Sequence, residues 1–377
     1  MYFLNESDAA LFPMARTGDI PKMLGWNLPP EHQHLVHEHW KVYPAPPYHM
    51  HLLLGMIYFV LMNMSLVGNG IVVWIFSTSK SLRNGSNMFI VNLAIFDLLM
   101  MIEMPMFLVN AVTEKMVGYD TACTVYATLG SVSGIGGAIT NAVIAFDRYR
   151  TISNPLDNRL SRKQAGILVA MTWFWTAPFT LLPMFKIWGR FIPEGYLTTC
   201  SFDYLTDDTE TRAFTVSIFT WAYTIPMSMI CFFYMKLYGH VRDHEAMLKN
   251  QARKMNVESL AANRNTKAEA VEIRIAKAAF TIFFLFVCSW TPYAIVAMTG
   301  AFGDKRKLTP FCTMIPAMCS KVVSCLDPWV YAISHPKYRE ELERRIPWMG
   351  IREEADNIST TDSKQTVVSD ANKVTGE

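Results

Sequence analysis

Residues 276–301 read AKAAFTIFFLFVCSWTPYAIVAMTGA, and Lys277, near one end, is the only charged residue among them. A helix of about 20 apolar residues spans the ~30 Å hydrocarbon core of a bilayer, so this stretch is long enough to cross a membrane. Comparable stretches lie at 52–77, 87–112, 121–146, 165–185, 212–235 and 309–333. The segments between them are too short to cover buried helices in a soluble protein. The sequence therefore predicts an all-α membrane protein with seven transmembrane helices.

The composition agrees with a membrane protein. Of 377 residues, 51% are hydrophobic and 18% are charged, whereas about 25% of residues are charged in a soluble domain. The formal net charge of +2 gives no basis for binding nucleic acid. Seven cysteines are too few for a small domain held together by disulfides.

Positive charge is distributed unevenly between the two sides of the predicted bundle. One group of segments consists of the connections after the first, third and fifth stretches and the C-terminal tail. The other group consists of the remaining connections and the N-terminal segment. The first group contains more than twice as many Lys and Arg residues as the second. Because basic loops stay in the cytosol, we expect an extracellular N-terminus and a cytosolic C-terminus. The basic segment 236–275 is expected to extend the fifth and sixth helices into the cytosol.

These patterns divide the chain into an extracellular segment (1–51), a seven-helix domain (52–334), an amphipathic helix (335–346) and a disordered cytosolic tail (347–377). Tyr338, Leu342 and Ile346 recur at every fourth position, which suits a helix lying on the membrane surface. The tail is polar and rich in Ser and Thr. Its candidate phosphorylation sites are Ser359, Thr360, Thr361 and Ser363.

Several extracellular residues carry a chemical signal. Cys123 and Cys200 both face the oxidising side, so a disulfide between them is plausible. Asn5 begins the sequence Asn-Glu-Ser, an acceptor for N-glycosylation. Four histidines cluster before the first helix: His32, His34, His37 and His39. They could bind zinc, but a polar surface without metal is the preferred interpretation.

Charged residues inside membrane helices are costly and mark functional sites. Here they are Asp97, Glu103, the pair Asp147–Arg148, Lys321 and Asp327. Lys321 lies near the middle of the seventh helix, too deep for an ammonium group to reach the surface easily. Burial favours its neutral amine, which is a nucleophile toward aldehydes. A Schiff base between Lys321 and a carbonyl cofactor is therefore one hypothesis, but from Lys321 alone a lysine in a structural ion pair is the preferred interpretation.

Arg148 lies at the cytosolic end of the third helix. Asp147 can neutralise it locally, and Glu272, at the cytosolic start of the sixth helix, could do so across helices. Breaking the second pair would free the sixth helix to move. A charged helix end without a switching role is the simpler interpretation of Arg148 alone.

Prolines interrupt several of the predicted helices, and a proline bends a helix because it lacks the backbone N–H. Asp327 precedes one of them, Pro328, and could form a polar cluster with Asn69 and Asp97. The prolines are Pro105, Pro178, Pro226, Pro292, Pro316 and Pro328.

Taken together, these residues resemble the rhodopsin-like G-protein-coupled receptors. The motifs, in chain order, are Gly68-Asn69, Leu93-Ala94 with Asp97, Asp147-Arg148-Tyr149, Trp173, Pro226, Trp290-Thr291-Pro292 and Asp327-Pro328-Trp329-Val330-Tyr331. Each motif is weak alone, but the ordered set covers all seven predicted helices. Within that family, Lys321, seven residues before Pro328, matches the retinal-attachment position of opsins.

Other stretches are similar to arthropod visual opsins, spider rhodopsins among them. They are Trp188–Gly195 with Cys200–Tyr204, Lys254–Leu260 and His335–Arg339. The resemblance implies covalently bound 11-cis-retinal in the dark, a photoreversible product and a heterotrimeric G protein of the q class as partner. It also implies arrestin, a receptor kinase and membrane lipid as partners, in the rhabdomeric plasma membrane of a photoreceptor cell.

A buried protonated Schiff base needs a negative charge nearby. In vertebrate visual opsins a Glu one turn after the helix-3 disulfide Cys supplies it, but here Tyr126 holds that position, and a neutral phenol can only hydrogen-bond. Glu194, six residues before Cys200, matches the counterion position of invertebrate opsins, and we favour it. Glu103, in the outward half of the second helix, is the rival, because sequence does not fix the direction of its side chain.

The resemblance also implies residues that line the retinal pocket. Trp290 and Tyr293 lie one turn apart on the sixth helix, where the family packs the ionone ring. The other matching positions are Ser131, Gly134, Tyr204, Tyr223 and Ala317. Ordinary packing between helices is the competing interpretation of each residue alone.

We therefore predict a light-activated receptor and not an enzyme. Retinal on Lys321 would strain the pocket near Trp290, the sixth helix would shift, and Glu272 would release Arg148. The alternatives are a retinal photoisomerase of the same fold, a light-driven ion pump or channel, and a receptor for a diffusible ligand. The last alternative leaves Lys321 unexplained.

Overall fold

The computed structural model describes residues 21–153, 159–255 and 260–351, without the side chains of 244, 245, 248–255, 260–272 and 333. Each predicted stretch forms a helical span, which confirms the predicted fold class. The spans are α3 (Tyr48–Thr78), α4 (Gly85–Ile102) with α5 (Met104–Thr113), α6 (Tyr119–Ser153), α7 (Arg162–Met184), α8 (Thr209–Phe219) with α9 (Ile225–Met255), α10 (Leu260–Phe302) and α11 (Pro310–Ser334).

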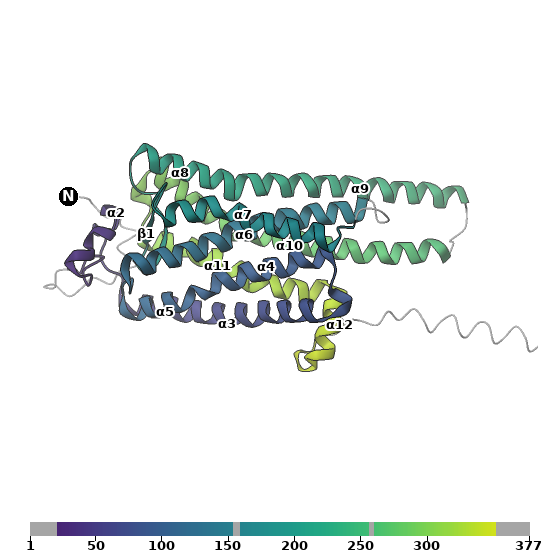
Figure 1. Ribbon diagram of the computed structural model, residues 1–377, viewed down its shortest axis with the longest axis horizontal. Coiled ribbons are helices and arrows are strands. Elements are labelled where there is room, and N and C mark those ends of the chain that lie inside the picture. The colour runs from purple at the N-terminus through teal and green to yellow at the C-terminus, as the bar shows by residue number, and fades with distance from the viewer. Residues whose placement is uncertain (1–20, 154–158, 256–259, 352–377) are drawn as a thin grey trace, which may run out of the picture.

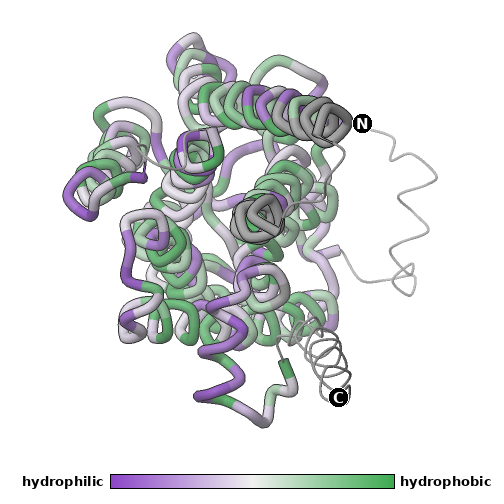
Figure 2. Tube along the Cα trace, turned by 90° about the vertical axis from the view of Figure 1, so that its right-hand side faces the viewer, coloured by the Kyte–Doolittle hydropathy of each residue, from purple (hydrophilic) through white to green (hydrophobic). Residues whose placement is uncertain are grey.

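The spans lie side by side in one bundle (Figure 1). Viewed along the bundle, the described parts of the helices are largely apolar (Figure 2). Within the described residues, six spans are long and apolar enough to cross a membrane. The span not among them is α11, which contains Lys321 and Asp327 in an otherwise mostly apolar helix. The charges that lower its hydropathy belong to the candidate site.

The third span, α6, is the central helix of the bundle. In its most apolar window 72% of residues are buried, against 28% in α3. Gly136 allows this close packing, since a Cβ there would lie 2.3 Å from Phe96. The interior of the bundle is therefore organised around α6.

The second span is broken between α4 and α5. Glu103 is the residue at the break, and Pro105 occupies the first turn of α5. A proline cannot donate the helical hydrogen bond and clashes with the preceding turn, so the α4 helix ends here. Asp97 lies six residues before Glu103 on α4. The break therefore changes the direction in which the Glu103 side chain points relative to that of Asp97.

A two-stranded antiparallel hairpin covers one end of the bundle, next to the N-terminal segment (Figure 1). Its strands, β1 (Phe191–Glu194) and β2 (Thr199–Phe202), pair Glu194 with Thr199 and Pro193 with Cys200. The turn between them includes Gly195 at φ 61°, where a Cβ would lie 2.6 Å from the Met314 sulfur. The predicted disulfide between Cys123 and Cys200 is confirmed, and it joins the hairpin to α6.

Residues 21–47 form a second layer at the same end of the bundle, which the sequence did not predict. It contains a 3-10 turn (Pro30–Leu35) and the short helix α2 (Glu38–Lys41). Trp40 is fully buried in a cluster that includes Tyr204 and Leu308. The first membrane helix begins at Tyr48, four residues before the predicted start.

At the opposite end of the bundle, α9 and α10 extend past the other helices (Figure 1). This agrees with the extension predicted for 236–275. The amphipathic helix α12 (Pro336–Arg345) lies across the same end, with Tyr338 and Leu342 buried. The predicted glycosylation site Asn5 and the Ser and Thr residues of the tail lie outside the described residues.

Candidate functional site

A cavity lies between α6, α8, α10, α11 and the hairpin. The space between its side chains, part of it open to solvent, is about 1010 Å³. Most of its wall is aromatic or aliphatic. Among the residues predicted for the pocket, it is lined by Lys321, Glu194, Glu103, Tyr126, Ser131, Gly134, Tyr223, Trp290, Tyr293 and Ala317.

Lys321 supplies the one buried amine of the described part of the cavity wall. Its Nζ lies 3.2 Å from Oε1 of Glu103, and their side chains are 9% and 0% exposed. The Tyr126 ring lies beside the same amine, with its centroid 5.9 Å from Nζ. The Lys321 amine, a nucleophile for an aldehyde, therefore lies next to the Glu103 carboxylate, which can compensate a positive charge.

Glu103 reaches this position because of the helix break. It stands between α4 and α5, and its Oε2 lies 3.0 Å from where a Cβ on Gly130 would be. The ion pair with Lys321 is the strongest favourable contact of this carboxylate, and the Tyr126 side chain and the Gly130 backbone add weaker ones. Together these contacts offset its burial.

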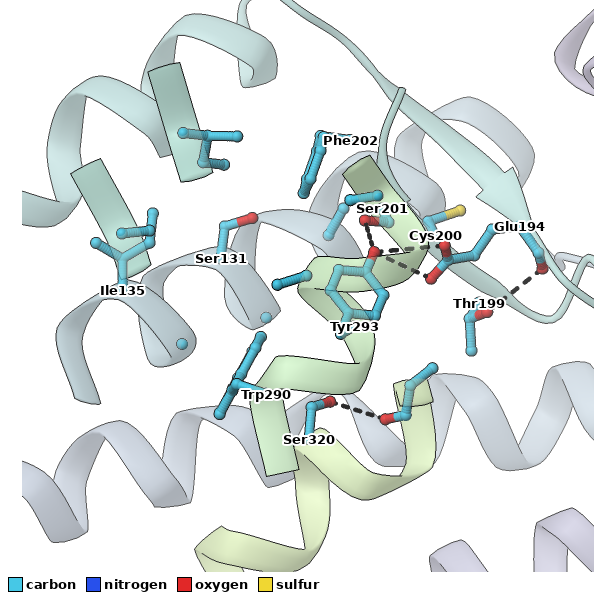
Figure 3. Close-up of a pocket in the computed structure, with 18 of the residues that line it drawn as sticks. Ser131, Ile135, Glu194, Thr199, Cys200, Ser201, Phe202, Trp290, Tyr293 and Ser320 are labelled. Atoms are coloured by element: carbon cyan, nitrogen blue, oxygen red, sulfur yellow. Dashed lines mark hydrogen bonds between the residues drawn. The ribbon is translucent and has the colours of Figure 1, made fainter. Parts of the chain in front are cut away.

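Glu194 lines the cavity from β1, and Tyr293 faces its carboxylate (Figure 3). A second tyrosine, Tyr204, also contacts it. Tyr204 donates a hydrogen bond of 2.8 Å to its Oε2, and the Tyr293 hydroxyl lies 3.4 Å from both carboxylate oxygens. Burial raises the pKa of Glu194 to about 7, against the effects of Tyr204 and of the Lys321 charge. Our preference for Glu194 as the counterion stays a prediction.

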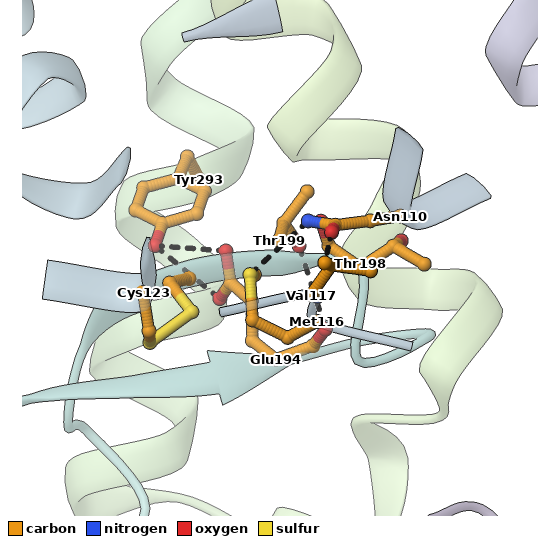
Figure 4. Close-up of a disulfide and its surroundings, with 9 residues drawn as sticks. Asn110, Met116, Val117, Cys123, Glu194, Thr198, Thr199 and Tyr293 are labelled. Atoms are coloured by element: carbon orange, nitrogen blue, oxygen red, sulfur yellow. Dashed lines mark hydrogen bonds between the residues drawn. A yellow bond between two sulfur atoms is a disulfide. The ribbon is translucent and has the colours of Figure 1, made fainter. Parts of the chain in front are cut away.

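The disulfide lies next to Glu194 and fixes the hairpin over the cavity (Figure 4). Asn110 of α5 supports the same turn, since its side chain donates a hydrogen bond of 3.1 Å to the Thr198 carbonyl. Tyr204 does not line the cavity wall and acts on it through Glu194. Thr199, Ser201 and Phe202 of β2 do line it (Figure 3), and the sequence analysis missed them. Their closeness to Cys200 in the sequence would have been the signal, because the predicted disulfide places that segment next to the third helix.

The deep end of the cavity is formed by Trp290 of α10 against α6. A Cβ on Gly134 would lie 2.5 Å from the indole of Trp290, so only glycine fits there. Tyr223 is carried by a π-helical turn, Thr220–Thr224, between α8 and α9. Its hydroxyl lies 2.5 Å from the Thr291 hydroxyl, which links this turn to α10.

The residues predicted to lie at the cytosolic end of the third helix form a separate cluster. Asp147 forms a salt bridge with Arg148 and accepts a hydrogen bond of 3.0 Å from Ser86. Tyr149 stacks on Phe233 of α9, with 6.0 Å between ring centroids. The side chain of Glu272 lies outside the described residues, so its predicted pairing with Arg148 stays a prediction.

The predicted polar cluster between the two ends is also brought together. Asn69 donates hydrogen bonds of 2.8 Å to the Ser324 carbonyl and 3.0 Å to the Ser65 hydroxyl. Asp97, Asp327 and Tyr331 are buried there, and Pro328 packs against α3 at Gly68. This cluster connects α3, α4 and α11 below the cavity.

The histidines that precede α3 make contacts within the protein. His39 lies 2.8 Å from the Leu308 carbonyl, His37 accepts from the His39 backbone, and His32 stacks on Tyr119. Within the described ranges, no three His, Cys, Asp or Glu side chains are arranged to hold a metal ion.

Comparisons with known proteins cover the whole of this site. A family model described as 7 transmembrane receptor (rhodopsin family) matches residues 68–331. Opsin-3 of Manduca sexta is 64% identical over 345 residues, which cover 91% of this chain and 90% of that protein. The blue-sensitive opsin of Apis mellifera is 56% identical and covered over 95% of both chains. The crystal structure of squid rhodopsin matches with a TM-score of 0.80 at 31% identity, over 87% of this chain and 94% of that one.

Proposed function

The chain belongs to the rhodopsin family of seven-transmembrane receptors, with opsins as its relatives, and from that premise we propose a light receptor that carries 11-cis-retinal on Lys321. As an opsin it is a visual photoreceptor of the G-protein-coupled class, a multi-pass membrane protein and not an enzyme. It binds retinal and acts on a heterotrimeric G protein. The isomer, the covalent link and the class of G protein are the proposal.

The residues present fit retinal, which is a long apolar aldehyde. The cavity wall is largely aromatic and aliphatic, and Lys321 presents a buried amine to it. The Lys321 amine would condense with the aldehyde and release water, which leaves a Schiff base on Nζ. When bound, retinal supplies the absorption of visible light and a change of shape on isomerisation. The buried amine beside a carboxylate is the observation that carries this proposal.

The charge on a protonated Schiff base would be compensated by the carboxylates that face it. Glu103 and Glu194 both line the cavity, and a buried cation without such a partner would lose its proton. Tyr204 and Tyr293 hold Glu194 in place. The protein would thus supply fixed negative charge around Nζ of Lys321.

The pocket is coupled to the cytosolic face through α10. Trp290 fills the space left by Gly134, so pressure on the indole is passed to α10. We propose that α10 then moves, that Arg148 is released from Glu272, and that a G protein of the q class binds. Arrestin and a receptor kinase would act on the same cytosolic face, with the N-terminus outside, in a rhabdomeric membrane.

The proposal is tested by the absorption spectrum of the purified protein after incubation with 11-cis-retinal. We expect a visible band in the parent protein and none in Lys321→Ala. After illumination, the parent should promote nucleotide exchange on a q-class G protein, and light absorbed by the product should restore the original band. A correctly folded parent with no visible band would refute retinal on Lys321. Exchange on another class alone would refute q coupling.

A further inference from the structure

A second cavity lies on the outside of the bundle, where α12 lies across the end of the helices (Figure 1). It is a groove between α3, α11 and α12, and the space between its side chains, part of it open, is about 750 Å³. Its wall is almost entirely apolar. Among the residues that line it are Met64, Val67, Ile71, Trp329, Leu342 and Met349.

The groove opens on the side of the bundle and not toward its interior. Met64, Val67 and Trp329 belong to membrane spans and are 40%, 62% and 39% exposed. On the outer surface of a span, exposed side chains face the acyl chains of the bilayer and not water. The medium that fills the groove is therefore lipid.

One end of the groove carries a positive charge. Val67, Ile71, Trp74 and Thr78 recur at every third or fourth position of α3, so they share one face of that helix. Arg345, at the end of α12, closes this face: its guanidinium carbon lies 5.0 Å from the centroid of the Trp74 ring, and its Nη1 donates a hydrogen bond of 2.5 Å to the Thr78 hydroxyl. An apolar groove along α3 thus ends at a guanidinium group.

The charge of Arg345 is only partly compensated. Its Nε donates a hydrogen bond of 3.0 Å to Oε2 of Glu341, and Arg344 donates one of 2.6 Å to the same oxygen. One carboxylate is therefore shared by two guanidinium groups, and the set keeps a positive charge. The Arg345 side chain is 18% exposed, and a guanidinium group binds phosphate oxygens well because its donors form a planar fork.

The chemistry of the groove selects among the molecules of a bilayer. A sterol carries a neutral hydroxyl group, which makes no use of the charge on Arg345. The cysteine nearest to α12 in the sequence is Cys325, which is buried in α11, so an acyl chain linked through a thioester is not the occupant. A phospholipid with a negatively charged headgroup matches both the apolar wall and the cation at its end.

We propose that this groove binds one anionic phospholipid, with an acyl chain against Val67 and Met349 and the phosphate at Arg345. The predicted orientation puts α12 at the cytosolic leaflet, where anionic lipids are found and where basic pockets between helices bind their headgroups. The proposal does not depend on retinal or on a G protein. The lipid would hold α12 against α3.

The charge is tested by native mass spectrometry of the full-length protein in detergent, with phosphatidylglycerol or phosphatidylcholine of the same acyl chains. A Lys or Arg at an anionic surface is worth about fivefold in affinity, so the parent should bind phosphatidylglycerol at least about fivefold more tightly. Arg345→Gln should lose that preference and keep its affinity for phosphatidylcholine. Lys163→Gln removes the same charge at an exposed residue of α7 and should keep the preference. Equal affinities in the parent, or the same loss in Lys163→Gln, would overturn the proposal.

The apolar wall is tested separately, in case Arg345→Gln releases α12. Val67→Trp fills the groove and should weaken the binding of both lipids by at least about tenfold, as expected when about two methylene groups lose their contact. The matched control is Val60→Trp, two turns earlier on α3 at a residue that is 54% exposed and does not line the groove. Unchanged binding in Val67→Trp, or equal losses in both variants, would contradict the proposal.

The position of the lipid is tested in phosphatidylcholine vesicles that contain phosphatidylglycerol with a photoreactive acyl chain. Cross-links should map to the peptides that contain Val67 and Met349, and cross-links only elsewhere would refute the assignment. Preferential labelling of these peptides by a photoreactive cholesterol would assign the groove to a sterol. A dimer that Val67→Trp dissociates would assign it to a second copy of the chain, and either result would overturn the proposal.

Discussion

The buried pair of Lys321 and Glu103 should matter for folding before any retinal is present. Removing one partner of a buried ion pair leaves the other uncompensated, at a typical cost of about 3 kcal/mol. Glu103→Gln should therefore lower the unfolding temperature of the retinal-free protein in detergent. The double variant Glu103→Gln with Lys321→Met should recover most of that loss. Equal loss in both variants would show that the pair is not coupled.

Gly134 offers a second residue-level prediction. A methyl group there would lie 2.5 Å from the indole of Trp290, closer than two such atoms can approach. Gly134→Ala must displace Trp290, so we expect slower formation of the visible band on addition of 11-cis-retinal. The rate of band formation measures this directly, and Gly137→Ala serves as the control. A normal rate in Gly134→Ala would mean that the indole moves without affecting the pocket.

The sequence could predict most of the candidate site at this scale. Lys321 was found because a charge in a membrane helix is costly, and Glu194 because its distance from Cys200 matches a known pattern. The direction of Glu103 could not be predicted, because it depends on how far the helix bends at Pro105. An ideal helix would turn residue 103 by about 240° from Asp97, and the break removes that relation.

Among the secondary-structure elements, the hairpin depends on its disulfide. The bond between Cys123 and Cys200 closes a loop with a sequence separation of 77 residues, worth about 4 kcal/mol in the chain-entropy description. Cys200→Ser should lower the unfolding temperature and weaken retinal binding, because β2 lines the cavity. The control is Cys312→Ser, at an exposed free thiol. An unchanged unfolding temperature in Cys200→Ser would argue against a structural role for the disulfide.

The attachment of α12 should depend on pH. Burial, with the nearby charge of Arg148 as a smaller cause, lowers the pKa of His335 from 6.5 to about 4. His335 therefore stays neutral in the folded state while the unfolded state takes up a proton, so stability is complete above about pH 6.5. It should fall by up to about 3 kcal/mol as the pH drops to about 4.

This pH dependence is measured as unfolding temperature between pH 7 and pH 4. His335→Asn keeps a side chain that can cap α12 but cannot titrate, so the difference between the two proteins isolates the histidine. The same pH slope in both proteins would assign the effect to other groups.

The apolar stretches predicted every membrane span, because the length needed to cross a bilayer is a strong constraint. Their ends were less accurate: α3 begins before 52, and α6 continues to Ser153. The hairpin and the fold of residues 21–47 were not predicted. They are held by contacts with distant segments, such as Trp40 against Leu308, which no local pattern records.

At the scale of the whole molecule, two layers cover the cavity at the end of the bundle where the hairpin lies. The inner layer is the hairpin, and the outer layer contains Trp40, which is fully buried against Tyr204. Trp40→Ala should cost about 3 kcal/mol and loosen Tyr204, which holds Glu194. We expect hydroxylamine to bleach the dark visible band faster in this variant. Trp26→Ala, at a residue 46% exposed, is the control, and equal bleaching rates would contradict a sealing role.

The arrangement of α6 and α10 also has a mechanical consequence. α6 is joined covalently to the hairpin and lies in the middle of the bundle, so it resists sliding along its axis. α10 rests on it through Trp290, two residues before Pro292. From Trp290 the arm to Leu260 is ~45 Å long and the arm to Phe302 ~18 Å, at 1.5 Å per residue. A tilt of α10 about this pivot is therefore amplified about 2.5-fold at its Leu260 end relative to its Phe302 end.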